Sequence, residues 1–128
     1  MAALSANNKL TNRDGVQFSD PVKAGVHIYE GAMVGLDASG YLAPAATAGI
    51  SVMRGFAMQE VDNTGGADGD LTCLLRKGVG HVAQTGLART DIETLVSVTD
   101  DATVGGSAAL KAGTLVDLDA AGAWVRID

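Results

Sequence analysis

One segment of this chain occurs twice. The residues GAMVGLDASGYL at 31–42 return as GTLVDLDAAGAW at 113–124, with glycine, valine, leucine, aspartate and alanine at matching places. The shared residues suit a strand, a tight turn and the start of a second strand, and they contain no nucleophile–base pair and no set of metal ligands. A chain that repeats a scaffold unit of this kind points to a structural protein rather than to an enzyme.

Each copy is predicted to form a β-hairpin. In the first copy Val34 and Leu36 alternate with Met33, and this period of two places the valine and leucine inward and Met33 outward. The same argument places Leu115 of the second copy outward. The Asp-Ala-Ser-Gly and Asp-Ala-Ala-Gly segments then turn the chain, because aspartate bonds nearby backbone N–H groups and glycine accepts a positive φ. A weaker third copy is expected at 95–104.

These copies are too few for a solenoid, which needs stacked repeats to bury a core. We therefore expect an all-β fold, a single small β-barrel or sandwich built of hairpins, either tulip-like or jelly-roll. Glycine is abundant, at 17 of 128 residues, and aromatic residues are only 4% of the chain, which favours many turns and a core of small aliphatic side chains. One domain is expected at this length, with an extended N-terminal arm at 1–20 and a β domain at 21–128.

The sequence also predicts a bulge in one strand of the β domain and the inward-facing residues of another. Gly55 is predicted to mark a bulge that re-aims Arg54. Leu71, Cys73 and Leu75 are expected to line the inner face of another strand, because they alternate with residues of the other parity.

Charge and hydropathy exclude several classes of function. The formal net charge is −6 and the pI is about 4.6, with no basic patch, so direct nucleic-acid binding is not expected. No apolar run approaches the ~20 residues that span a bilayer. The N-terminus lacks the charged segment followed by an apolar segment that is typical of a signal peptide. The single cysteine excludes an internal disulfide and fits a reducing compartment, so we expect synthesis in a cytoplasm.

The residues able to carry chemistry do not form a recognisable site. The acidic turn at 62–70 is the best metal candidate, but it departs from the EF-hand pattern because Cys73 stands where that loop needs a glutamate. Cys73 is expected to be a buried, inert thiol. His27 and His81 each lack a second metal ligand at a suitable spacing. A catalytic triad of His81, Cys73 and an aspartate can be drawn, but no sequence spacing supports it. We expect no catalytic residue, no cofactor and no bound metal.

Five residues are candidates for a protein interface: Asn12, Arg13, Phe18, Trp124 and Arg126. The first three belong to the polar segment 1–20, which is either an interaction arm or a disordered tail. Trp124 and Arg126 alternate with apolar residues and are expected to face outward together, as side chains that are enriched at interface hot spots. The alternative is a tryptophan at the edge of the core under a loop. The inward set of this last strand is Ala123, Val125 and Ile127.

The order of these motifs resembles a family of small bacteriophage head proteins, the capsid cement or decoration proteins. The resemblance runs from about Leu10 to Ile127, and its motifs lie at 21–32, 34–42, 55–57, 61–70, 76–79, 98–104, 113–119 and 124–127. Each motif alone is weak, and their order and spacing together carry the resemblance. The chain departs from the pattern at Glu93 and Thr94, where a glycine is expected. Thr90 and Glu93 also have the spacing of a capping box, which predicts one helical turn.

The resemblance implies a non-enzymatic subunit on the outer face of the virion head. Such a subunit binds the major capsid protein, bridges its copies and stabilises the shell against internal DNA pressure. It implies a homo-oligomer, with a homotrimer favoured over a dimer. The alternative is a tail or fibre accessory β module that binds a protein or a glycan, although the chain offers few aromatic platforms for sugars.

Overall fold

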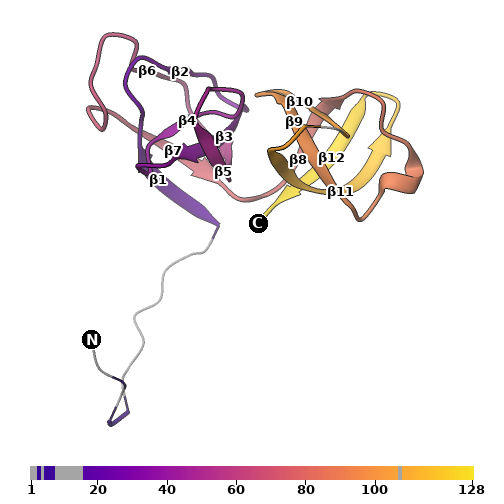
Figure 1. Cartoon of the computed structure of the whole chain (residues 1–128), viewed down its shortest axis with the longest axis horizontal. Helices are drawn as coiled ribbons and strands as arrows, with labels where there is room; N and C mark the ends of the chain where they lie inside the picture. Colours follow the sequence, from indigo (N-terminus) through magenta and orange to yellow (C-terminus); the bar gives the residue numbers. More distant parts are fainter. Residues whose placement is uncertain (1–2, 4, 8–15, 107) are drawn as a thin grey trace.

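The computed structural model describes residues 3, 5–7, 16–106 and 108–128. In these ranges the chain forms twelve strands and one short 3-10 helix, which confirms the all-β fold class. The strands are divided between two β units that lie side by side (Figure 1). Lys77 is the one residue between the last strand of the first unit and the first strand of the second.

The first unit is a five-stranded sheet in the order β1-β7-β5-β3-β4. Its strands are β1 (Gln17–Pro21), β3 (Met33–Asp37), β4 (Leu42–Pro44), β5 (Ile50–Ala57) and β7 (Thr72–Arg76), and a two-stranded ribbon adds β2 (His27–Ile28) and β6 (Val61–Asp62). Directly after β1, Val22 makes a parallel bridge to Leu42, and the Lys23 N–H donates to the Leu42 carbonyl at 2.8 Å. These contacts bring the two outer strands of the sheet together.

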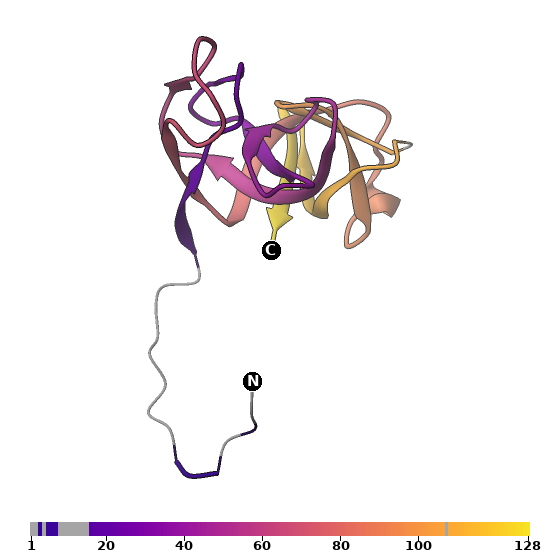
Figure 2. The ribbon, with the colours of Figure 1, turned by 60° about the vertical axis from the view of Figure 1, so that its left-hand side comes forward.

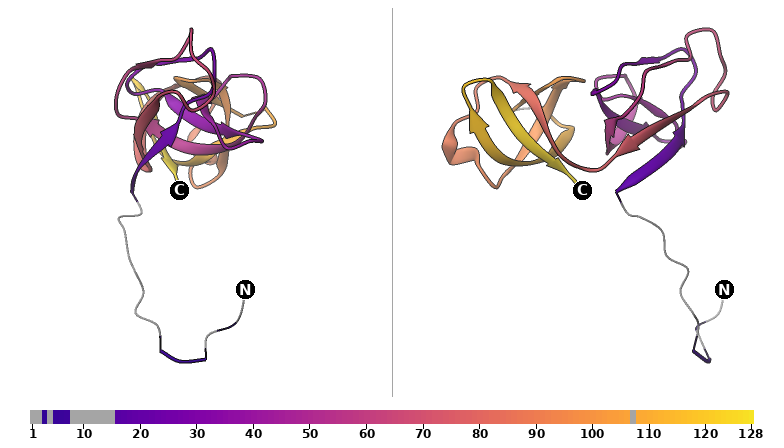
Figure 3. Two further views of the ribbon diagram at one scale, coloured as in Figure 1. Left: turned by 90° about the vertical axis from the view of Figure 1, so that its left-hand side faces the viewer. Right: turned by 180° about the vertical axis from the view of Figure 1, so that it is seen from behind.

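The second unit is a closed barrel in the order β10-β8-β12-β11-β9, so the barrel expected from the sequence is present. Its elements are β8 (Gly78–Gln84), the 3-10 helix η1 (Arg89–Asp91), β9 (Leu95–Asp100), β10 (Thr103–Gly105), β11 (Lys111–Asp119) and β12 (Gly122–Ile127). The right-hand view of Figure 3 shows the barrel from behind, next to the first unit.

The two units share one topology. If the strands of each unit are numbered along the chain, both sheets have the order 1-5-4-2-3. The third strand then meets the first in parallel, through β10 and β8 in the barrel and through the Val22–Leu42 bridge in the first unit. The chain is therefore built from two copies of the same five-stranded arrangement.

The sequence repeat does not follow this structural repeat. The hairpin β3–β4 corresponds by topology to β9–β10, which contains the weaker copy expected at 95–104. The better sequence match, 113–124, forms the hairpin β11–β12, whose counterparts β5 and β7 are separated by the long segment that carries β6. All three predicted hairpins are confirmed.

The two units share a core. Met33 and Val34 are neighbours on β3 and both are fully buried. Met33 packs with the barrel residues, whereas Val34 packs within the first unit. The prediction that Met33 faces outward is wrong, because the second unit covers that face of the sheet. A middle strand with two buried faces has no outward set.

Bulges explain the other departures from simple alternation. Leu115 is fully buried rather than outward, because the register of β11 against β12 shifts between Leu115 and Asp117. In the pairing of β3 with β5, Val34 is opposite Gly55 and the next residue of β3 is opposite Met53, so Arg54 is skipped. This register shift confirms the bulge predicted beside Gly55.

Cys73 and Leu75 are buried as predicted, but Leu71 is exposed. The reason is that β7 begins only at the following residue, so Leu71 lies at the end of a loop.

The predicted helical turn is confirmed as η1, with a different cap. The carboxylate of Asp91 accepts the Ala88 N–H at 2.8 Å, in place of the expected pairing of Thr90 with Glu93. Glu93 has a φ of 72°, and it is the one non-glycine residue with a positive φ in the described part of the chain. Glu93 is one of the two positions at which the resemblance described above led us to expect a glycine.

Candidate functional site

The residues that could carry catalysis are not brought together. Cys73 is buried in β7, where burial raises the pKa of its thiol and the Sγ donates to the Gln59 carbonyl at 3.7 Å. His81 lies in the barrel, with its Nε2 3.2 Å from Asp119 Oδ1. The triad that can be drawn from the sequence is therefore split between the two units.

The acidic turn at 62–70 uses its carboxylates to hold backbone. Asp62 Oδ1 accepts the Thr64 N–H at 3.0 Å and the Thr64 hydroxyl at 2.7 Å, and these bonds lower the pKa of Asp62. Asp68 accepts the Ala24 N–H at 2.8 Å. Within the described ranges, no group of three or more His, Cys, Asp or Glu residues is placed to hold a metal ion.

The N-terminal interface candidates lie in two places. Asn12 and Arg13 fall outside the described residues. Phe18 is in β1, so residues 17–20 of the expected arm belong to the sheet of the first unit. The guanidinium carbon of Arg54 lies 4.2 Å from the centre of the Phe18 ring, and Arg54 Nε donates to Asp20 at 2.6 Å. Phe18 thus packs against the first unit.

The two C-terminal candidates face outward from β12, as predicted, and the inward set Ala123, Val125 and Ile127 is buried. Trp124 is 39% exposed, and its Nε1 donates to Asp119 Oδ2 at 3.0 Å. Its ring lies 4.7 Å from the ring of His81. Arg126 Nε lies 3.3 Å from Asp128 Oδ1.

Arg126 belongs to a row of side chains that crosses four strands of the barrel. Leu95 on β9 is paired with Thr114 on β11, Thr114 with Arg126 on β12, and Arg126 with Val79 on β8. Residues directly opposite in antiparallel strands project from the same face. The row ends in two exposed apolar residues, Leu95 at 62% and Val79 at 53% exposure.

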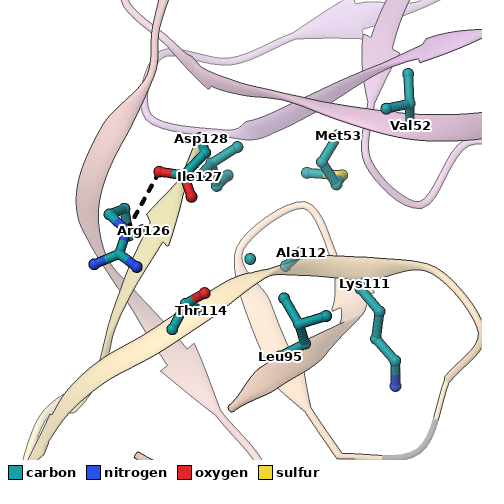
Figure 4. Close-up of a pocket in the computed structure, with 10 residues that line it drawn as sticks. Val52, Met53, Leu95, Lys111, Ala112, Thr114, Arg126, Ile127 and Asp128 are labelled. Atoms are coloured by element: carbon teal, nitrogen blue, oxygen red, sulfur yellow. Dashed lines mark ion pairs between the residues drawn. The ribbon is translucent and has the colours of Figure 1, made fainter. Parts of the chain in front are cut away.

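The row runs along the junction of the two units. At the Leu95 end, a groove of about 220 Å³ separates the barrel from β5 of the first unit (Figure 4), and Val52 of β5 is 52% exposed on its other side. Because the barrel is closed and the row crosses four of its five strands, the row bends around the barrel, and Val79 lies away from Leu95. We name the residues Val52, Leu95, Thr114 and Arg126, which line this groove together, the junction face.

A second groove, of about 250 Å³, lies at the Val79 end and is also lined from both units. Phe56 of β5 and Gly80 of β8 form part of its wall.

The junction face has the composition of a protein contact. Exposed large apolar residues gathered on one face mark interaction sites more often than scattered ones do, and arginine is enriched at such sites. Sequence reasoning found Arg126 but missed Val52, Val79 and Leu95. Alternation could have placed Val79 on the outer face with His81, but no local signal shows that strands from two units meet there.

Comparisons with protein-family models, with curated proteins and with solved structures found no match. In the residues that the structure describes, no helix has the length and apolar character needed to cross a membrane.

Proposed function

We propose that this chain is a structural decoration protein of a bacteriophage head, which binds the major capsid protein on the outer surface of the shell. The observation that supports it most is the junction face, which places the exposed apolar residues Val52 and Leu95 at one groove with Arg126, while the described residues form no recognisable catalytic arrangement. The order of the sequence motifs, which resembles that of the capsid decoration proteins, is the basis for naming the major capsid protein as the partner and the outer head surface as the location.

The body has the stiffness that a cement subunit needs. The units are joined by one residue, and Met33 packs its side chain into the barrel core. The Met33 N–H also donates to the Asp101 carbonyl of the β9–β10 turn at 2.8 Å. A subunit held in this way transmits load between the capsid subunits that it bridges.

Two like units also fit a repeating lattice. Each unit presents the same five-strand arrangement, so the pair offers two related surfaces to two neighbouring capsid subunits. Self-association as a homotrimer, with a dimer as the alternative, would add further contacts. Many copies on one shell gain avidity, so each single contact need not be strong.

A glycan-binding role in a tail or fibre module is the second candidate. The observation in its favour is Trp124, whose ring is partly exposed next to His81. Binding of the purified protein to a glycan array, lost in Trp124→Ala, would support it.

Co-sedimentation with purified, undecorated phage heads tests the proposal. Saturable binding is expected, and it should fall when Val52→Asp and Leu95→Asp, both in the junction face, are combined. Arg89→Gln is the matched control, since Arg89 is a well-exposed surface residue paired only loosely with Asp117, at 3.7 Å. Failure of the unmodified protein to pellet with the heads would contradict the proposal.

A further inference from the structure

The second groove of the junction is lined by two cationic side chains, Arg76 and Lys77, and we propose that it binds an acidic, aliphatic-rich segment of a partner protein. The groove is lined by Arg76 and Lys77 from the first unit and its link to the barrel, and by His81 from β8. No aspartate or glutamate is among the residues that line it. The function proposed above does not specify the chemistry of the partner.

The two cations of this groove contact backbone oxygens. Arg76 Nε donates to the Lys77 carbonyl at 3.4 Å, and Lys77 Nζ donates to the backbone oxygen of Asp128 at 2.8 Å. Neither side chain forms one of the ion pairs between described residues, whereas Lys23, Arg54, Arg89 and Arg126 each pair with an aspartate. Arg76 and Lys77 therefore hold positive charge that an incoming carboxylate can meet.

The floor of the groove is apolar. The Phe56 ring lies against the backbone of Gly80, so closely that a Cβ built on Gly80 would be 2.6 Å from the ring Cζ. Val79, with half of its surface exposed, also lines the groove. An aliphatic side chain can rest on Phe56 and Val79 while a neighbouring carboxylate reaches Arg76 or Lys77.

The charge of the whole chain favours a protein segment over a nucleic acid. The formal net charge is −6, which repels a long polyanion, and nucleic-acid binding relies on many phosphate contacts along a basic surface. A short acidic segment needs only two or three matching charges. Complementary charge of this kind chiefly improves the association rate and the choice of partner.

The test is a titration of the ¹⁵N-labelled full chain with the peptide acetyl-Leu-Glu-Val-Glu-Leu-Glu-amide, followed by NMR. We expect saturable shifts of the amides of Phe56, Val79, Gly80 and His81. The matched peptide with glutamine in place of glutamate should bind at least about tenfold more weakly, since it lacks the charges that the groove recognises.

Two variants separate the groove from general electrostatics. The double variant Arg76→Gln, Lys77→Gln should lose about tenfold in affinity for the acidic peptide. Lys111→Gln should bind normally, because Lys111 also lacks a carboxylate partner among the described ion pairs but lies at the other groove. An unchanged amide spectrum outside the groove confirms that each variant is folded.

The inference is overturned by equal binding of both peptides, by shifts that map elsewhere, or by no shift at millimolar peptide. It is also overturned if a single-stranded DNA oligonucleotide produces the same groove shifts more tightly, or if the groove amides shift on dilution alone, which would identify a second copy as the occupant. Because the peptide assay contains no capsid, its failure leaves head binding to be judged separately.

Discussion

Asp37 and Asp119 occupy the same place in the repeated segment and hold their hairpins in the same way. Asp37 Oδ1 accepts the Ser39 N–H at 2.9 Å, and Asp119 Oδ1 accepts the Ala121 N–H at 2.9 Å. Each carboxylate thus closes its own turn through the backbone two residues further on. The repeated aspartate is a structural acceptor in both hairpins.

The second oxygen of each aspartate binds a different partner. Asp37 Oδ2 accepts from Lys23 Nζ at 2.7 Å, whereas Asp119 Oδ2 accepts from the Trp124 indole at 3.0 Å. The Lys23 hydrogen bond lowers the pKa of Asp37 to about 2, and the hydrogen bonds from Trp124 and His81 lower the pKa of Asp119 to about 2. Both hairpins are therefore stabilised by the ionised carboxylate.

The first prediction concerns acid. Both pKa values are lowered in the folded chain, so these carboxylates stabilise it fully above their unfolded value of 3.8 and lose that effect as the pH falls toward 2. Asp37→Asn and Asp119→Asn should lower the melting temperature at pH 7, and the difference from the unmodified chain should shrink as the pH approaches 2. Thermal unfolding followed by circular dichroism measures this. Glu30→Gln, at an exposed site, is the control, and a difference that persists unchanged at pH 2 would contradict the account.

The second prediction compares the first glycine of each repeat. Gly31 has a φ of 85° and open space where a Cβ would lie, so Gly31→Ala should cost about 1–2 kcal/mol of backbone strain. A Cβ on Gly113 would be 2.1 Å from the Arg126 carbonyl oxygen, which requires the β11–β12 pair to move. Gly113→Ala should therefore be the more destabilising change, and it should lower the free energy of unfolding by about 1–3 kcal/mol or more. Urea unfolding of both variants checks the order, and the reverse order would show that the close approach is not limiting.

The third prediction concerns Glu93, which holds a positive φ with its N–H bonded to the Leu115 carbonyl at 2.7 Å. Glycine adopts this conformation without the steric penalty of a Cβ. Glu93→Gly should raise the free energy of unfolding by up to about 1 kcal/mol. Glu93→Ala removes the side chain but keeps the Cβ, and it should give little or no gain. A glycine variant no more stable than the alanine variant would mean that the turn relaxes in another way.

The fourth prediction concerns the N-terminal arm. Residues 17–20 form part of β1, so a deletion that tests the arm must stop before Gln17. Removal of residues 1–15 should leave the melting temperature within a few degrees of the full chain and weaken its binding to undecorated heads. Replacement of Asn12 and Arg13 by alanine in the full chain should weaken binding in the same direction. If both forms occupy heads as fully as the unmodified protein, the arm has no part in attachment.

The sequence predicted the hairpins because their information is local. In the first and last hairpins an aspartate, a glycine three residues later and alternating flanks are enough to specify a turn and its two strands. The bulge at Arg54 could be predicted for the same reason, since it depends on one local backbone conformation, whereas the glycine-like site at Glu93 was expected only from the family resemblance. Trp124 and Arg126 were placed outward correctly because the last strand is regular.

The division into two units could not be predicted, because it depends on contacts between distant residues. Met33 has the outward parity of its strand, and only the barrel packed against it makes that position buried. The sequence match between 31–42 and 113–124 also concealed the true correspondence, since the same hairpin pattern serves at two places in one topology. Val52 and Leu95 line one groove because strands of the two units meet there, which alternation within any one strand does not reveal.

The most direct measurement is a cryo-electron reconstruction of phage heads pelleted with the purified protein. The account predicts added density at fixed lattice positions, into which the two β units of Figure 2 fit with the junction face, including the exposed residues Val52 and Leu95, against the capsid surface. Heads that carry no added density, or density in which the junction face points to solvent with no neighbour, would contradict it.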